Sequence, residues 1–558
     1  MTMRAALLVG VLVLSSACVE VRAPRAPGAE SPRAAIDAIT DAVVSRPAAA
    51  RALGLRDAFD GKVADYSEAG ILARGKKLEA AQGDLAALDA TKLGEDEALD
   101  VALLRLAIEE ELFQIRELET WRRRPQFYEE LFALDPYLTR DYAPLDERAR
   151  RLLAHVKASL PQTHHIEENL KGPLPEPFVK TDIGIYRGYA EYLGGDVVRL
   201  LGGVTDTALR DEAIAAVKEL GARAAHVADY LEKQELPRAD KSYILGAAQY
   251  ARLLEVQEAL QIPLPEFERM AEEDLGRNKA AYEALVGSTN VSRPPIPKLL
   301  ETATKLTFDA KAFLQDKRLV TLPPEGEIEV KETPPFMQWN SAFLDGPGPF
   351  DRPDLTAYYY ITLPDPSWPA KEQEEYVMPF GTLLATSVHE VFPGHFLHGQ
   401  WIRRAPTRTQ KMLTSYSFVE GWAHYGEQLM IEEGFGADDP QSRLGQLGDA
   451  LLRNCRFVVS IGLHTKGMTL EQAEERFVKD CFQDRATAKQ QAYRGTFDPG
   501  YFAYTLGKIQ ILELRAEAKA ALGSKFDSQR FHDALLAHGA PPVPLIRERV
   551  LRDIGAAR

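Results

Sequence analysis

The sequence has few cysteines, no excess of positive charge and no long apolar run beyond its first residues. Its three cysteines form no Cys-x-x-Cys pair, which excludes a zinc-ribbon type of site. Lys and Arg number 67 against 82 Asp and Glu, and because so acidic a surface repels phosphate backbones, we expect no nucleic-acid partner. The 558 residues are 45% hydrophobic and 27% charged, which is typical of a globular protein with a large core.

The N-terminus has the pattern of an export signal. Arg4 precedes an apolar run, Ala5 to Leu14, that is too short to span a bilayer as a helix. The following Leu14-Ser15-Ser16-Ala17-Cys18 resembles a bacterial lipobox, which implies cleavage before Cys18 and lipidation of that residue. The alternative is an ordinary signal peptide cut near Ala17, with Cys18 incidental. Both predict an exported protein, and the lipobox predicts a membrane-anchored lipoprotein in the periplasm or at the cell surface.

The sequence does not show whether the two remaining cysteines, Cys455 and Cys481, are paired. In an oxidising compartment they can form a disulfide. Two buried free thiols are equally compatible with the sequence.

Helical periodicity dominates the chain after its first residues, for example in the segments between 209 and 286. The pattern changes at about 322–368, which is rich in Pro, Gly and aromatic residues. Within it, residues 327–331 alternate and residues 357–363 are β-prone. We therefore predict a mainly α fold with a small β-element directly before the most informative helix.

That helix is predicted to begin near Pro379, because apolar residues then recur on one face. It carries His389-Glu390 and, further on, His395. In the zincin motif His-Glu-x-x-His, two histidines one turn apart bind zinc and the glutamate polarises a water. Here the second histidine follows the first by six residues instead of four.

This spacing requires a distorted helix. At about 100° per residue, positions i and i+6 point about 120° off a common face, so a regular helix does not aim both rings at one ion. Pro393 and Gly394 stand between the histidines. Proline disrupts a helix and glycine accepts unusual backbone angles. We predict a break there that returns His395 to the site.

A third ligand is expected on the next helix. Glu420, His424 and Glu427 share one face at i, i+4 and i+7. Glutamate is the usual third ligand of a His₂Glu peptidase, so Glu420 is the candidate and His424 its rival. Such a site suits zinc and leaves a position open for water.

These motifs resemble a known family. His389-Glu390-x-x-Pro-Gly-His395, followed by Phe418-x-Glu420-Gly-Trp422-Ala-x-Tyr425, is similar to the bacterial domain of unknown function 885 family over about residues 35–555. That family resembles gluzincin metallopeptidases of the angiotensin-converting enzyme, thimet oligopeptidase and Taq carboxypeptidase groups. The resemblance implies a multi-helix metallopeptidase-like fold with a central cleft and a small β-element near the active site.

The resemblance also implies roles near the C-terminus. Related peptidases carry two tyrosines three residues apart, matched here by Tyr501 and Tyr504. By that likeness Tyr504 donates its hydroxyl to the oxyanion of the reaction, and Tyr501 contacts the substrate. Arg494 lies ten residues before Tyr504 and can hold a substrate carbonyl or carboxylate.

The resulting hypothesis is an exported zinc-dependent peptidase that hydrolyses short peptides, with Glu390 as general base. Two alternatives stay open: a metal-dependent amidohydrolase that acts on cell-wall fragments, and a lipid-anchored binding protein on a decayed peptidase scaffold. We predict a signal peptide over residues 1–17, the lipidated cysteine and a flexible tether over 18–33, and a helical metallopeptidase-like domain over 34–558.

Other residues have simpler interpretations. Trp422 is expected in the core, and His398 is expected to pack or to orient a ligand. His164, His165 and Glu167 are interpreted as solvated residues of a polar helix.

Overall fold

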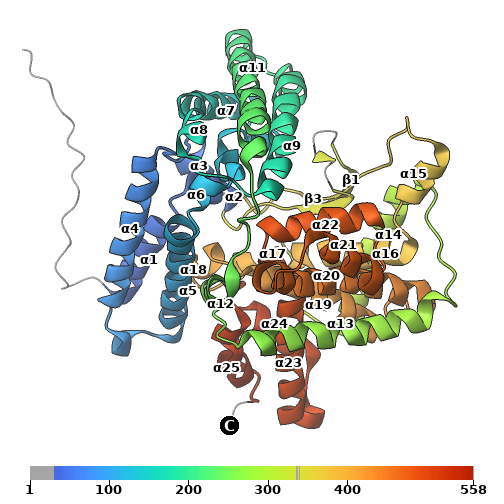
Figure 1. Ribbon diagram of the computed structural model, residues 1–558. Coiled ribbons are helices and arrows are strands. Elements are labelled where there is room, and N and C mark those ends of the chain that lie inside the picture. The colour runs from blue at the N-terminus through green and yellow to red at the C-terminus, as the bar shows by residue number, and fades with distance from the viewer. Residues whose placement is uncertain (1–30, 335–336, 339, 557–558) are drawn as a thin grey trace, which may run out of the picture.

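The computed structural model describes residues 31–334, 337–338 and 340–556. Most of this chain is helical, so the predicted mainly α fold class is confirmed (Figure 1). The predicted signal peptide (1–17), the lipidation site Cys18 and nearly all of the tether lie outside the described residues.

The first half of the chain forms two helical groups (Figure 1). The first group contains α1 (Pro32–Val43), α4 (Glu68–Ala86), α5 (Glu95–Leu112) and α6 (Thr120–Arg123). The short helices α2 (Pro47–Ala52) and α3 (Arg56–Phe59) contribute no residue to either cluster. The second contains α7 (Leu145–Ser159), α8 (His165–Asn169), α9 (Glu176–Tyr192), α10 (Val198–Leu201) and α11 (Thr207–Tyr230).

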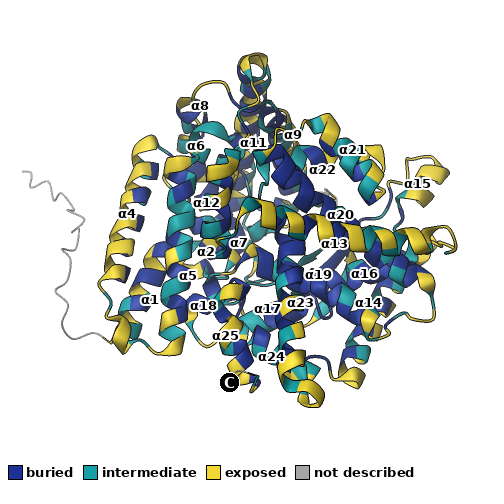
Figure 2. Cartoon of the chain, turned by 60° about the horizontal axis from the view of Figure 1, so that its bottom comes forward, coloured by how far each residue is buried: buried dark blue, intermediate teal, exposed yellow. Residues whose placement is uncertain are grey.

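The later helices surround two further hydrophobic clusters. One cluster involves α12 (Gly246–Glu258), α13 (Leu264–Val286), α20 (Pro440–Thr465), α21 (Leu470–Cys481) and α22 (Arg485–Phe497). The other helices are α14 (Leu299–Lys317), α15 (Ala370–Tyr376), α16 (Phe380–Glu390), α17 (His395–Arg404), α18 (Arg408–Met412), α19 (Tyr416–Glu432), α23 (Ala503–Leu522), α24 (Ser528–Leu536) and α25 (Val543–Asp553). Peripheral helices such as α4 are exposed on their outer face, whereas α16 and α19 are mostly buried (Figure 2).

The predicted small sheet is present in the described chain. It has three strands, β1 (Ile328–Glu332), β2 (Ala342–Asp345) and β3 (Ala357–Ile361), in the order β1-β3-β2. β1 runs parallel to β3, whereas β2 runs antiparallel to it with Leu344 opposite Tyr359. Tyr359 is fully buried and its hydroxyl lies 3.3 Å from Ser387 Oγ, so the sheet packs directly on α16.

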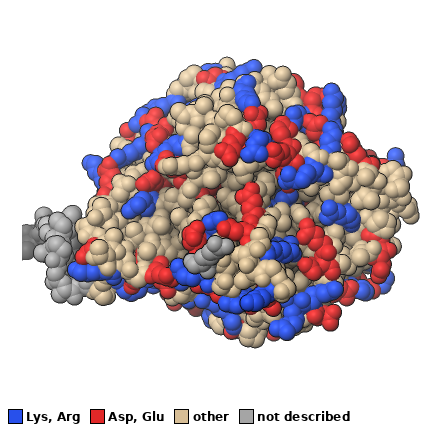
Figure 3. All heavy atoms as spheres, turned by 90° about the horizontal axis from the view of Figure 1, so that it is seen from below, with Lys and Arg blue, Asp and Glu red and all other residues tan. Residues whose placement is uncertain are grey.

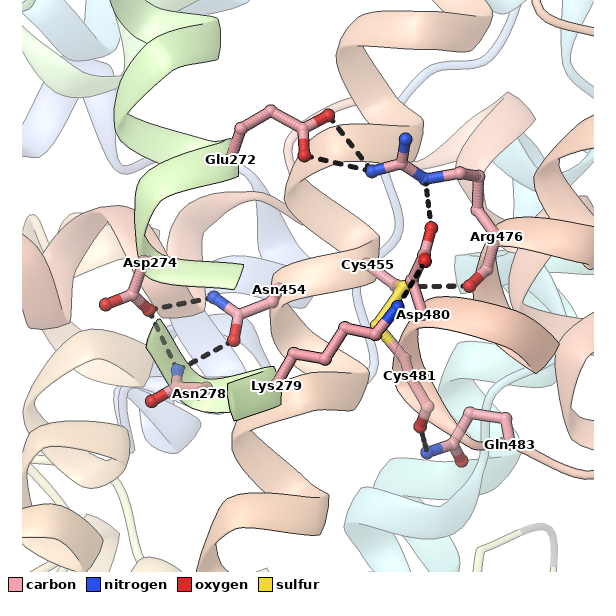
Figure 4. Close-up of a disulfide and its surroundings, with 10 residues drawn as sticks. All are labelled: Glu272, Asp274, Asn278, Lys279, Asn454, Cys455, Arg476, Asp480, Cys481 and Gln483. Carbon is pink, nitrogen blue, oxygen red and sulfur yellow. Dashed lines mark hydrogen bonds and ion pairs between the residues drawn. A yellow bond between two sulfur atoms is a disulfide. The ribbon is translucent and has the colours of Figure 1, made fainter. Parts of the chain in front are cut away.

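Cys455 of α20 and Cys481 of α21 form a disulfide, which decides the question that the sequence left open (Figure 4). The neighbouring Asn454 donates to Asp274 of α13 at 2.8 Å. Asp274 also accepts from Lys508 of α23 at 2.7 Å, and both side chains are buried. α20 is therefore held by a covalent bond on one side and by a buried polar network on the other.

The surface carries charges of both signs. On the face that Figure 3 shows, Lys and Arg alternate with Asp and Glu without a large patch of one sign. Among the described residues, none of the helices combines the length and the apolar character that a membrane crossing requires.

Candidate metal centre

The helix that carries the first histidine ends where the sequence predicts its break. α16 stops at Glu390 and α17 starts at His395. A Cβ at Gly394 would lie 1.7 Å from the His389 carbonyl oxygen, so only glycine allows this turn. The turn brings the rings of His389 and His395 to a centroid distance of 4.7 Å. The predicted distortion is confirmed.

The carboxylate of Glu420, on α19, lies close to the imidazole rings of both histidines. Its Oε2 lies 3.4 Å from His389 Nε2 and 3.5 Å from His395 Nε2. One donor atom from each residue lies within 4.8 Å of the others. Burial alone would raise the pKa of Glu420, but the charges of His395 and His389 lower it well below its ordinary value.

The three residues fit a zinc ion. Glu420 Oε2 is buried and has no hydrogen-bond partner in the described part of the chain, so a carboxylate oxygen faces the two imidazoles without a donor of its own. Two imidazole nitrogens and one carboxylate oxygen are a donor set that zinc prefers. The predicted ligands His389, His395 and Glu420 are therefore brought together.

A buried carboxylate lies behind His389. His389 Nδ1 is 2.7 Å from Glu427 Oε1, and the Glu427 side chain has no exposed surface. Arg453 of α20 approaches the same oxygen at 3.3 Å. Burial alone would raise the pKa of Glu427, but the charges of Arg453 and His424 hold it below its ordinary value. Since Nδ1 is engaged with Glu427, Nε2 remains the atom that faces Glu420.

His424, the rival ligand, is not part of the donor group. It is fully buried and its Nδ1 lies 3.2 Å from Glu427 Oε2. Burial lowers its pKa to about 4. Its place is thus beside Glu427, on the far side of the carboxylate from His389.

The sequence did not assign the roles of Glu427 and Arg453. Glu427 was visible on the same face as Glu420, and that spacing was the available signal. Arg453 belongs to no sequence motif. It reaches the site only through the packing of α20 against α16 and α19.

Glu390, the predicted general base, is held by the sheet. Its Oε2 accepts a hydrogen bond of 3.0 Å from the backbone N–H of Leu344 in β2. The small β-element thus positions the carboxylate that follows His389 in the motif. Nothing in the periodicity of the sequence indicated this contact.

Tyr504 lies near the start of α23, close to the histidines. Its ring is stacked on that of His389 at 6.5 Å, and its hydroxyl is 3.5 Å from that of Tyr416. α23 approaches α19 very closely, since a Cβ at Gly421 would lie 2.4 Å from Gly507 Cα. This close packing of two helices brings Tyr504 close to His389.

Arg494 and Tyr501 have different surroundings. Arg494 pairs with Asp498 at 2.9 Å and donates to the Tyr416 hydroxyl at 3.0 Å, so it lies next to the tyrosine pair. Tyr501 is fully buried, with the guanidinium of Arg494 6.0 Å from its ring centroid. This burial leaves no surface of Tyr501 for a substrate, and its expected substrate contact has no support in the geometry.

The residues with simpler interpretations are not among the three grouped donors His389, His395 and Glu420. Trp422 is fully buried and donates to the Pro393 carbonyl at 2.8 Å, and His398 is buried with its Nε2 3.3 Å from the Gly539 carbonyl. His164 and His165 group with Glu168 on the surface, and Glu167 pairs with His226 instead. Exposed groups of this kind are common without a metal.

These features define a mainly α-helical protein with a His₂Glu centre beside a small sheet. The model of DUF885, described as a bacterial protein of unknown function, matches residues 47–550. The chain belongs to this family. A comparison with curated proteins gives no match.

Solved structures share the fold. A candidate lipoprotein of unknown function from Shewanella oneidensis has a TM-score of 0.74 at 23% identity, over 94% of this chain and all of the other. A candidate lipoprotein from Colwellia psychrerythraea has a TM-score of 0.75 at 18% identity, over 94% and 98%. A Pyrococcus furiosus carboxypeptidase covers 94% and 98% at 13% identity, but its TM-score of 0.39 is too low to support a conclusion.

Proposed function

We propose that this protein is an exported zinc-dependent peptidase that hydrolyses short peptides. The observation that carries the proposal is the convergence of His389, His395 and Glu420, with one donor atom of each within 4.8 Å of the others. Glu427 supports it, because a carboxylate behind a histidine ligand is the usual outer partner in zinc sites.

The side chains divide the chemistry between them. Zinc, when bound, supplies a Lewis acid that polarises a carbonyl and makes water more acidic. Glu390 accepts the proton of the attacking water and passes it to the leaving amine. Tyr504 donates its hydroxyl to the oxygen on which charge develops. Arg494 offers a charge-assisted hydrogen bond to a substrate carbonyl or carboxylate.

The location follows from separate evidence. The lipobox-like segment that ends at Cys18 supports export and attachment to a membrane through a lipid. The disulfide between Cys455 and Cys481 supports an oxidising compartment. Two proteins with the same fold are themselves candidate lipoproteins.

The first test is the metal content of purified residues 19–558. We expect about one zinc per chain, lost in a His389→Ala/His395→Ala variant. His164→Ala/His165→Ala is the matched control, because it removes two histidines outside the proposed centre, one exposed and one partly buried, and should keep the zinc. Absence of zinc after incubation with the metal would favour a binding protein on a peptidase scaffold.

The second test concerns hydrolysis. Glu390→Gln should retain zinc and lose activity on a panel of short peptides. Full activity of this variant would contradict the assigned role of Glu390. Activity on muropeptides without activity on peptides would identify an amidohydrolase of cell-wall fragments instead.

A further inference from the structure

A cavity of about 300 Å³ lies beside His395, between α17 and the segment that follows β2. Its wall is largely apolar and includes Leu344, Pro347, Pro349, Pro353, Leu355 and Phe396. Two of its residues connect it with the proposed reaction centre. His395 is one of the three grouped donors, and the Leu344 backbone holds Glu390. A group in this cavity would therefore lie against His395 and beside the strand residue that holds Glu390.

The arginine side chains that line the cavity already form hydrogen bonds or ion pairs with other residues of the chain. Arg403 donates to the Gly348 carbonyl at 2.7 Å and to the Asp351 carbonyl at 2.8 Å. Arg404 pairs with Glu325 at 2.7 Å. A charged ligand would lose its water here and gain little in return, which is unfavourable. An apolar ligand gains from the remaining surface.

We propose that this cavity is the subsite for a bulky apolar side chain, such as phenylalanine, of the substrate residue next to the hydrolysed bond. This inference rests on the proposed peptidase function. The size agrees, because a cavity of roughly 150 Å³ holds a benzene ring and this one is about 300 Å³. One methylene group in such a pocket is worth on the order of 10- to 200-fold in kcat/KM, and phenylalanine exceeds alanine by a whole ring.

A substitution at Gly399 can block the subsite and leave the three proposed metal ligands unchanged. Gly399 lines the cavity one turn after His395, and a Cβ at this position would meet no atom within 4 Å. The Cβ of a Gly399→Leu side chain therefore enters open space at the wall of the cavity, and leucine favours the helix more than glycine does. Gly276→Leu on α13 is the matched control, since its Cβ also points into open space and it is not part of the cavity.

The experiment uses one peptide backbone in which Phe, Leu, Ala, Asp or Lys replaces each position in turn. Mass spectrometry locates the cleaved bond, and kcat/KM is measured for each peptide. We expect kcat/KM of the Phe peptide to exceed that of the Ala peptide by roughly 10-fold or more at one position beside that bond. Gly399→Leu should bring the Phe peptide down to the Ala peptide with zinc content unchanged, whereas Gly276→Leu should behave as the wild type.

Three results would overturn the subsite: equal rates for all side chains, a preference for Asp or Lys, or a Phe preference that Gly399→Leu leaves intact. Failure of the underlying function looks different. In that case the zinc-loaded wild type cleaves no peptide of the series, and the subsite assignment falls with it.

Discussion

Replacing Glu427 with glutamine should weaken zinc binding about 10- to 100-fold, although Glu427 is not itself a ligand. Its Oε1 lies 2.7 Å from His389 Nδ1, and the Glu427 side chain is fully buried. The carboxylate orients the ring and makes Nε2 a better donor to a cation. Glutamine keeps the shape and a hydrogen-bond acceptor but removes the charge. The loss of zinc affinity therefore measures the electrostatic part of the interaction between Glu427 and His389.

The same change should destabilise the metal-free protein. Arg453 is paired with Glu427 at 3.3 Å and only 11% of its side chain is exposed. Removing one partner of a buried pair typically costs about 3–5 kcal/mol. Arg453→Met in the same chain removes the stranded charge. We therefore expect the double variant to regain most of the stability but not the zinc affinity.

Two measurements separate these effects. Competition with a chelator gives the Kd for zinc, and denaturation of the metal-free protein gives the free energy of unfolding. Glu374→Gln on α15 is the control, because Glu374 lies exposed on the surface and the change should alter the stability by only about 0.5 kcal/mol. Wild-type zinc affinity in Glu427→Gln, together with a fall in stability, would show that Glu427 serves only as the partner of Arg453.

Three further predictions concern other parts of the molecule. Tyr504→Phe should retain zinc and lower kcat by about 10²- to 10³-fold; an unchanged kcat in steady-state assays would exclude its role as a donor. Replacing Cys455 and Cys481 by alanine should lower the free energy of unfolding by about 3 kcal/mol, and an unaltered denaturation midpoint would contradict this. Burial raises the pKa of Glu258 from 4.5 to about 7. Its stabilising contribution is therefore full below pH 4.5 and is lost as the pH rises through 7. Glu258→Gln should remove about 3 kcal/mol of pH dependence from this window, which thermal denaturation at several pH values can test.

The elements around the centre follow closely from local patterns. The apolar face of residues 380–391 predicts α16, and the Pro393-Gly394 pair predicts where it breaks. The β-prone segment at 357–363 predicts β3. Such signals are readable because helix and strand periodicity, proline and glycine act over a few residues.

The spacing of residues also indicated the donor group. Glu420 lies on the helix that follows the motif helix, and helix periodicity places it on one face together with His424 and Glu427. Ligand chemistry favoured Glu420, but helix periodicity by itself did not separate it from His424, because one face of a helix covers a wide arc. The packing of α19 against α16 places Glu420 beside the two histidines. His424 instead contacts the other oxygen of Glu427.

Contacts between distant segments had no local signal. Arg453 reaches Glu427 from another helix, and the Leu344 N–H reaches Glu390 from a strand 46 residues away. The pairing of Cys455 with Cys481 and the burial of Tyr501 are of the same kind. Local chemistry therefore determines which residues form each helix and which face it buries. Packing determines which of those faces meet, because that depends on the shape of every surface brought into contact at once.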